Sequence, residues 1–256
     1  MKIAVLIKQV PDTEEDRHLA ANGVVDRAAS DRVADEITER ALEVALKKKD
    51  ADKNVEIVAV TMGPATATEA LRKALSLGAD SAVHIQDDEL VGADALTTAR
   101  ALSGALKDGA FDVIIAGNES TDGRGGVVPA MVAEFLGLAF LGPLNAVDFN
   151  DEKVTGERQN AEGTQTISAA LPAVLAITES TGEARFPKFK GIMTAKRKPI
   201  AVHTAVALGL HGNNHSAGNV VISAAKRPAR SAGTKMIDEG NAAAQLADYL
   251  SAENLI

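Results

Sequence analysis

The residues with the clearest chemistry are glycines and small hydroxyls that follow an apolar run. Residues 114–116 read as the end of a buried strand, residues 117–129 as a glycine-rich loop, and residues 128–136 as a helix. Peptide N–H groups point into open space at such a junction, and glycine lets a ligand approach the backbone closely. The helix N-terminus favours an anion by roughly 0.3–1 kcal/mol. This pattern predicts a site for a nucleotide phosphate.

The loop differs from the common phosphate motifs. It lacks the Gly-Lys-Ser/Thr of a Walker loop, and no Gly-x-Gly-x-x-Gly follows the first predicted strand, which disfavours phosphoryl transfer and a standard dinucleotide fingerprint. Asn118, Ser120 and Thr121 are able to hydrogen-bond a ribose or a phosphate. Asp122 either accepts from a ribose hydroxyl or caps the following turn, and Arg124 either pairs with a phosphate or is solvated. A glycine-rich connection without a ligand is the plain alternative.

A second polar segment, Lys-Gln-Val-Pro-Asp-Thr at residues 8–13, leaves the first predicted strand. Its place at the carboxyl end of a parallel strand favours contact with a ligand. A plain turn set by Pro-Asp is an equal alternative.

A third segment, residues 185–198, is basic in a chain that is acidic as a whole. It holds six basic residues, no acidic residue and two of the six phenylalanines. Phenylalanines among the charges are typical of a contact surface with an apolar anchor and a cationic rim, here suited to an acidic protein face. Solvated surface is the alternative interpretation.

These segments need a scaffold, and strand patterns alternate with helical patterns before residue 138. Strands are predicted at residues 3–7, 55–60, 81–85 and 112–116, and helices from an N-cap at Asp31 to Lys49 and at residues 65–77 and 93–107. This order predicts an α/β fold with a Rossmann-like parallel sheet covered by helices on both faces. Ligands of such sheets lie beyond the carboxyl ends of the strands.

The pattern changes after residue 138. Short antiparallel strands are predicted at residues 144–149, 153–158 and 164–169, a buried strand at 172–177, a linker at 208–216 and a helix at 241–250. We expect a nucleotide-binding domain, residues 1–207, that includes this small antiparallel extension, and a linker with a C-terminal arm, residues 208–256. The arm has little core of its own and is expected to pack on another molecule.

Composition excludes several classes of function. The net charge of −8 and an aromatic content of 3% argue against a nucleic-acid binder. The absence of cysteine removes disulfides, thiolate catalysis and cysteine metal sites, and the histidines show no metal-ligand spacing, so no metal is expected. No apolar run approaches the ~20 residues that cross a bilayer, and the N-terminal run is too short for a signal peptide, so a cytoplasmic location is expected. The residues form no constellation for independent catalysis.

On these motifs the sequence resembles the electron transfer flavoprotein beta-subunit family. The resemblance is carried by residues 5–13, 70–80, 117–123 and 185–198, in the family's order across nearly the whole chain. The amino acids in these motifs are similar to those of actinobacterial members. The resemblance implies an adenine nucleotide alpha hydrolase-like fold and a structural AMP. It also implies an alpha-subunit partner that holds most of one FAD.

The resemblance further implies an electron carrier rather than an enzyme. Such a heterodimer takes electrons from acyl-CoA dehydrogenases of fatty acid oxidation and related flavin dehydrogenases. It passes them to a quinone oxidoreductase. The C-terminal arm would then pack on the alpha subunit.

The family's functional positions fall on named residues of this chain. The implied nucleotide contacts are Leu6, Arg32, Val33, Ala34, Asp35, Met62, Gly117, Asn118, Glu119, Ser120, Thr121, Asp122, Gly123, Arg124, Gly125, Gly126, Val127 and Val128. The implied partner-recognition loop, at about residues 183–198, contributes Arg185, Phe186, Lys188, Phe189 and Lys190.

Three positions depart from the family's pattern. Phe189 stands where an apolar anchor, usually Leu, is expected; Thr13 stands where some members have a Tyr near the flavin; Arg32-Val33 replaces Asn-Pro. Two alternatives stay open: a bifurcating-type subunit with a second FAD in the AMP site, and a stand-alone adenine-nucleotide-binding enzyme or regulator. AMP is preferred over FAD because the loop differs from the Gln-Ala-Ile-Asp-Gly-Asp wording common in the bifurcating relatives.

Overall fold

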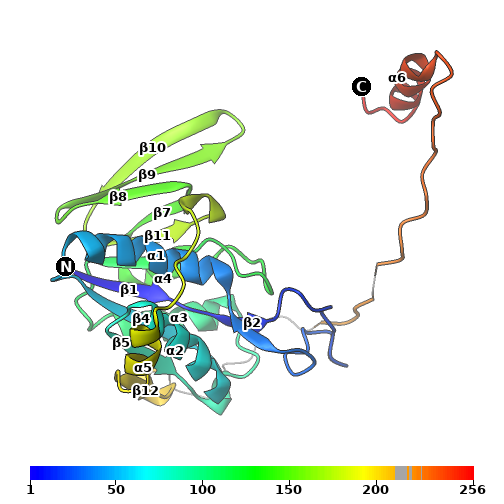
Figure 1. The fold of residues 1–256 in the computed structure, drawn as a ribbon. Coiled ribbons are helices and arrows are strands. Elements are labelled where there is room, and N and C mark those ends of the chain that lie inside the picture. Colours follow the sequence, from blue (N-terminus) through cyan, green and yellow to red (C-terminus); the bar gives the residue numbers. More distant parts are fainter. Residues whose placement is uncertain (211–217, 219–220, 226) are drawn as a thin grey trace. The chain divides into compact units, whose positions relative to one another are not determined.

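Seven parallel strands form the central sheet of the computed structural model, in the order β12-β5-β4-β1-β6-β11-β7 (Figure 1). The structure describes residues 1–210, 218, 221–225 and 227–256. It consists of two units, residues 1–221 and 222–256. The strands of this sheet are β1 (Lys2–Leu6), β4 (Glu56–Met62), β5 (Ser81–Ile85), β6 (Val113–Gly117), β7 (Ala139–Leu144), β11 (Ala173–Ile177) and β12 (Ile200–His203).

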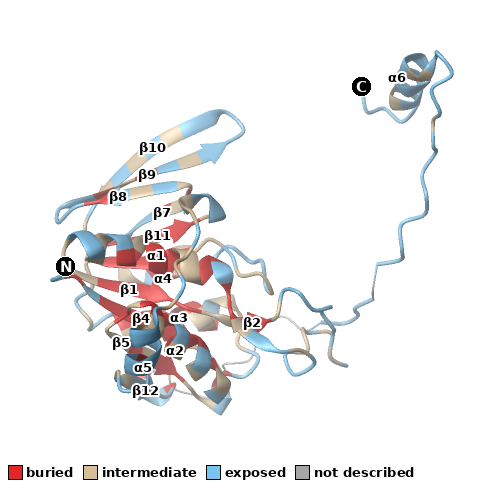
Figure 2. Cartoon of the chain, in the orientation of Figure 1, coloured by how far each residue is buried: buried red, intermediate tan, exposed pale blue. Residues whose placement is uncertain are grey.

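Helices cover both faces of the sheet because its strands are apolar on both sides. On β1, Ile3 and Val5 point into one core with α1 (Glu36–Ala51) and α2 (Thr68–Leu77). Ala4 and Leu6 point into the other, with α3 (Ala95–Leu106) and α4 (Val128–Leu136). Figure 2 shows these strands as the most buried part of the first unit. A fully buried Ile or Leu contributes about 1.5–3 kcal/mol. The predicted Rossmann-like parallel sheet is confirmed.

The start of the first helix was predicted wrongly. Instead of helix from an Asp31 N-cap, Arg32–Ala34 forms strand β3, which pairs antiparallel with β2 (Gln9–Pro11). The pair places Val10, which is buried, opposite Val33, and α1 begins only at Glu36. Pairing with a segment about twenty residues away outweighs the local helical pattern here.

The antiparallel extension is confirmed, with different bounds. It comprises β8 (Ala146–Phe149), β9 (Lys153–Asn160) and β10 (Gly163–Ala170), in the order β10-β9-β8. The turn after β8 is set by Asn150, whose Oδ1 accepts from the amides of Glu152 and Lys153 at 2.9 and 3.0 Å. Strands β7 and β12, both at the edges of the main sheet, were not predicted.

Shorter elements complete the first unit: α5 (Phe189–Ala195) and the 3₁₀ turns η1 (Ala65–Ala67), η2 (Asp88–Leu90), η3 (Glu179–Thr181) and η4 (Val206–Leu208). Of the predicted linker, residues 211–216 lie outside the described residues. Across the described ranges no helix has both the length and the apolar character to cross a bilayer.

The second unit contains one helix, α6 (Ala242–Ala252). None of its residues is buried, and Leu246 and Tyr249 are exposed. The predicted terminal helix is confirmed within a few residues. Its apolar side chains are unpartnered within this unit.

Candidate functional site

The carboxyl ends of the central strands meet at one edge of the sheet and place the predicted nucleotide contacts together. Leu6 ends β1 beside Val60 of β4, and Gly117 ends β6 beside Ile177 of β11. Met62 ends β4 at the same edge. The glycine loop, residues 118–127, leaves β6 there and leads into α4. Contacts predicted from three strands and one loop therefore surround a single region of the surface.

The glycine loop presents free backbone donors at its second half. In the described part of the chain, the amides of Gly125, Gly126 and Val127 donate to no protein acceptor, and all three residues are exposed. Arg124 has φ +46° and Gly126 φ +65°. Left-handed residues alternating with right-handed ones turn successive amides toward one point, which forms an anion-binding concavity. These amides also lie at the N-terminus of α4, where the helix dipole favours negative charge.

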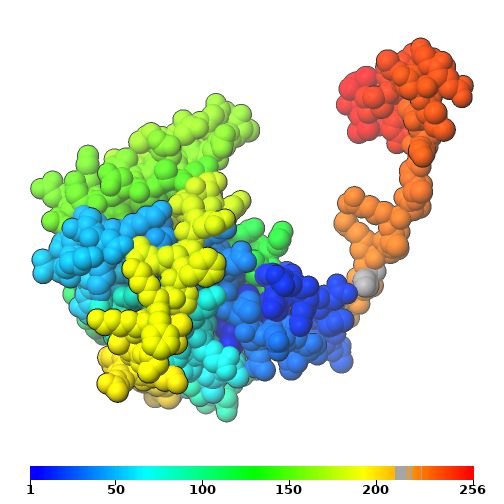
Figure 3. Space-filling model, viewed as in Figure 1, coloured from blue at the N-terminus to red at the C-terminus, as the bar shows by residue number. Residues whose placement is uncertain are grey.

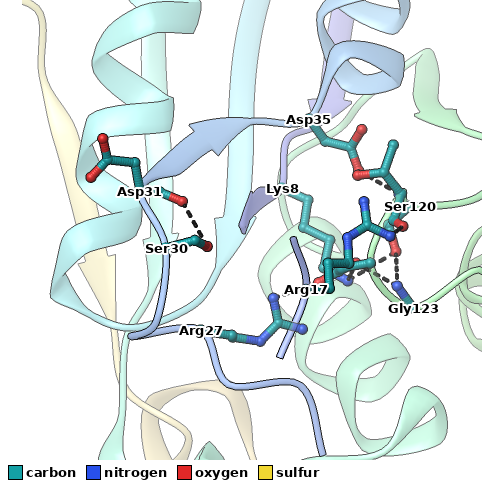
Figure 4. A network of polar contacts seen from close by, with 10 residues as sticks. Lys8, Arg17, Arg27, Ser30, Asp31, Asp35, Ser120 and Gly123 are labelled. Atoms are coloured by element: carbon teal, nitrogen blue, oxygen red, sulfur yellow. Dashed lines mark hydrogen bonds and ion pairs between the residues drawn. The ribbon is translucent and has the colours of Figure 1, made fainter. Parts of the chain in front are cut away.

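The first half of the loop is held by an ionic cluster around Asp122 (Figure 4). The Asp122 side chain is fully buried. Its Oδ1 lies 2.8 Å from Lys8 Nζ and accepts from the Gly123 amide at 2.6 Å, while its Oδ2 pairs with Arg27. Lys8 also donates to Ser120 Oγ at 3.0 Å. The carboxylate thus joins the end of β1, the loop and the segment between β2 and β3.

This cluster keeps Asp122 ionised. Burial by itself acts to raise the pKa of Asp122, but the hydrogen bond and charge of Lys8, the Ser120 hydroxyl and the charge of Arg27 outweigh it and hold the pKa well below its usual range. Both oxygens of Asp122 have protein partners, Lys8 and the Gly123 amide at Oδ1 and Arg27 at Oδ2.

A second carboxylate, Asp35, has the opposite surroundings. It precedes α1, is completely buried, and accepts from the Thr121 amide at 2.9 Å and the Thr121 hydroxyl at 3.2 Å, both through Oδ2. Its Oδ1 is buried and has no hydrogen-bond partner among the described residues. Burial raises the pKa of Asp35 above its ordinary value of 3.8, against the lowering effect of the Thr121 bonds. Such an orphaned oxygen is a site at which a ligand group is expected to bond.

The remaining predicted contacts lie on the β2–β3 pair. Arg32 and Val33 line a hollow of about 330 Å³ together with Thr66 and the acidic side chains of Asp12, Asp31 and Glu69. Arg32 donates to Thr66 Oγ1 at 3.2 Å. Ala34 is buried. The family's Asn-Pro position is therefore an exposed β-strand in this chain.

The three cations that hold the glycine loop were only partly foreseen from the sequence. Lys8 could be inferred, because it lies just after β1, which pairs with β6, and adjacent parallel strands end side by side. Arg17 and Arg27 were missed, since residues 12–31 show no periodicity. Arg17 donates to the Thr121 carbonyl.

The basic segment lies on α2, apart from the glycine loop. Its helix α5 packs on α2, and Figure 3 shows the two segments as adjoining yellow and cyan atoms. A Cβ on Gly191 would overlap the Ser76 carbonyl oxygen. Phe186 and Phe189 are 90% and 79% exposed, and Met193 is exposed beside them. This surface is apolar with lysines at its rim.

Arg185 differs from the other residues of that segment. It pairs with Glu43 through Nε and Nη2, at 2.7 and 2.9 Å, and with Asp50 at 2.8 Å, all on α1. The hydrogen bond to Glu43 raises the pKa of Arg185, and this effect is larger than the lowering that burial causes. This residue therefore fastens the segment to α1.

Among the described residues, no three His, Asp or Glu side chains are grouped so that they could hold a metal ion. The polar groups that are present, free amide donors and a buried carboxylate oxygen that accepts, fit a phosphorylated molecule that also carries hydroxyl or amino groups.

Comparisons with known proteins agree with this arrangement. The model of the electron transfer flavoprotein domain family matches residues 22–208. An electron transfer flavoprotein subunit beta of Mycobacterium tuberculosis is 47% identical over 263 aligned positions that cover 99% of each chain. One from Megasphaera elsdenii is 36% identical and covers 81% of this chain and 80% of its own. The caffeyl-CoA reductase-Etf complex subunit CarD of Acetobacterium woodii is 31% identical, with 82% and 80% covered.

Proposed function

The chain belongs to the electron transfer flavoprotein family as a beta subunit that pairs with an alpha subunit, and on that premise we propose that it binds AMP at the glycine loop. The AMP is structural. The redox cofactor is FAD, held mainly by the alpha subunit, and this chain contributes surroundings and docking rather than catalysis of its own. The proposed setting is the cytoplasm.

One observation carries the AMP proposal: in the described part of the chain, the exposed amides of residues 125–127 donate to no protein acceptor, and the same loop is held at Thr121 by Asp35, whose buried Oδ1 has no hydrogen-bond partner there. A phosphate would accept from the amides, and a ribose hydroxyl or adenine amino group would donate to the carboxylate. Leu6 and Met62 would provide apolar contact at the strand ends.

The test is to denature the purified heterodimer and analyse the released small molecules by mass spectrometry. We expect AMP and FAD in a 1:1 ratio. Two FAD molecules and no AMP would replace the proposal by the bifurcating-type site. Absence of any adenine nucleotide other than one FAD would reject a nucleotide site in this subunit.

The exposed surface of α5 supports a second part of the proposal, docking of donor dehydrogenases. Phe186, Phe189 and Met193 would enter an apolar depression, while Lys188 and Lys190 would face acidic groups around it. Electrons would come from acyl-CoA dehydrogenases and related flavin dehydrogenases and go to a quinone oxidoreductase. Arg185 would act indirectly, by holding the segment on α1.

Phe189→Ala tests this docking surface. We expect a slower transfer from an acyl-CoA dehydrogenase with unchanged thermal stability, because the ring is 79% exposed. Val91→Ala, which shortens another exposed apolar residue, is the control. Equal rates for the two variants would remove Phe189 from the docking surface.

A further inference from the structure

Residues 12–31, which we call the excursion, leave the sheet between β2 and β3 and fold back onto the glycine loop. The excursion has its own backbone bonds: the Asp26 amide donates to the His18 carbonyl at 2.9 Å, and Leu19 forms a β-bridge with Val25. From this frame Arg27 reaches Asp122, and Arg17 reaches the Thr121 carbonyl (Figure 4). The two ends of the excursion lie side by side, where the Asp12 amide donates to the Asp31 carbonyl at 2.8 Å.

These contacts immobilise one half of the loop from three directions. Lys8 holds it from β1, Asp35 holds it from the start of α1, and Arg17 and Arg27 hold it from the excursion. The held residues, 120–122, lie only a few positions before the free amides of residues 125–127. The position of those amides therefore depends on how firmly residues 120–122 are fixed.

Of these contacts, the one made by Arg27 is not fixed in position by the central sheet or its helices. Lys8 lies just after the buried strand β1 and Asp35 at the start of a long helix, whereas Arg27 lies within residues 12–31, outside the sheet. Asp122 is fully buried and Arg27 is 48% exposed, so the guanidinium covers the carboxylate from the solvent side. Bonds between two ionised groups are roughly twice as strong as neutral ones.

We propose that Arg27, assisted by Arg17, is a positioning residue of the nucleotide site: it fastens the excursion to the loop so that the amides of residues 125–127 stay aimed at a phosphate. This inference rests on the proposed AMP function. Arg27 is proposed to act on phosphate binding alone. The affinity for adenosine, which has no phosphate, should therefore not depend on Arg27. Preorganised donors bind tighter because less freedom is lost on binding.

The experiment measures the dissociation rate of AMP from the heterodimer by exchange with isotope-labelled AMP. We expect Arg27→Gln to release AMP about tenfold faster or more, the range for losing a charged hydrogen bond, and Arg27→Lys to stay near the unmodified protein. The matched control is Arg158→Gln on β9, which removes one arginine from the antiparallel extension. After removal of the bound nucleotide, the unmodified protein and all three variants should bind adenosine with the same affinity.

The pairing itself is tested by a double-mutant cycle. Asp122→Asn removes the partner of Arg27, so adding Arg27→Gln to it should change the rate no further. Additive effects, or an Arg27→Gln rate equal to that of Arg158→Gln, would overturn the inference. So would equal losses of AMP and adenosine affinity.

One measurement needs no variant. Arg27 is half-exposed, so salt screens its pairing, and AMP release from the unmodified heterodimer should accelerate with ionic strength. A rate independent of salt would overturn the inference even if Arg27→Gln fails to fold. The proposed function fails separately, when unmodified protein contains no AMP at all.

Discussion

Two carboxylates beside the glycine loop show how neighbours decide the charge of a side chain. Asp122 is buried but keeps its charge, because Lys8 and Arg27 face it. Asp35 is buried against a threonine and lacks a cation, so burial raises its pKa. One therefore serves as an ionic centre for the loop. The other serves as a hydrogen-bonding group whose charge is costly to bury.

This difference predicts a pH dependence for Asp35. A carboxyl whose pKa is raised on folding binds more protons in the native state, so its stabilising contribution is largest at low pH and falls as the pH rises through the raised value. Asp35→Asn keeps the shape and removes the titration. Measured by urea unfolding, the free energy of unfolding of the unmodified chain should fall relative to that of Asp35→Asn as the pH rises above the ordinary value of 3.8. A difference that does not vary with pH would contradict the raised pKa.

At the residue scale, the sequence predicts the exposed amides of the proposed phosphate site better than it predicts the side chains that hold the loop. Glycine spacing after an apolar strand is a local signal, and it places Gly125, Gly126 and Val127 correctly at a helix N-terminus. Arg17 and Arg27 give no such signal, because their partners are about a hundred positions away in the chain. Such pairing follows from the path of the excursion, which no periodic pattern specifies.

Among the elements, α5 is held at both ends by polar contacts rather than by burial. Arg185 ties its N-terminal side to α1. On its C-terminal side Arg72 donates to the carbonyls of Ala195 and Lys198, at 2.7 and 2.9 Å. Lys198 in turn donates to the carbonyls of Leu75 and Ala79, at 2.9 and 2.6 Å, at the end of α2. Phe189 is thus presented on a short helix that is anchored on both sides, and Phe186 lies three residues before it.

Lys198→Met is expected to loosen this helix. The ammonium satisfies carbonyls at the end of α2 that lack helical partners, a contact worth about 0.3–1 kcal/mol as a helix C-terminal cation. We expect a drop in thermal stability of a few degrees at most and a larger proportional drop in the rate of electron transfer from a dehydrogenase. Lys107→Met, at an exposed position after α3, is the control. Full transfer rate in the Lys198 variant would show that the anchoring is unnecessary for docking.

The elements themselves are predicted in proportion to their length and local pattern. The long helices and the central strands have clear apolar periodicity and were predicted within a few residues. β2 and β3 have three residues each and β12 four, so their patterns are too short to stand out from loop. β7 contains Gly142 and Pro143, which are both unusual inside a strand, so its sequence does not predict a strand.

For the molecule as a whole, the two units differ in what stabilises them. Both apolar cores lie within residues 1–221, and the second unit buries none of its helix. Its exposed Leu246, Tyr249 and Ile256 are consistent with a segment that finds its partner on another chain. The expectation that this arm packs on the alpha subunit therefore stays a prediction.

Truncation after residue 221 separates folding from association. Because the cores are retained, the shortened chain should keep its circular dichroism spectrum and unfold within a few degrees of the full chain. It should copurify with the alpha subunit in much lower yield. Equal copurification would mean that the arm is dispensable for pairing, and an unfolded product would mean that it supports the first unit.

The position of β12 has a consequence for biosynthesis. This strand pairs with β5 at the far edge of the sheet, although 114 residues, 86–199, lie between the end of β5 at Ile85 and the start of β12 at Ile200. A nascent chain that has emerged as far as β11 carries six of the seven strands, and the outer hydrogen-bonding groups of β5 stay open until residue 203 leaves the ribosome. During that interval the growing chain exposes an apolar strand edge that could pair with another chain. Chaperones that bind nascent chains would be most useful at this stage.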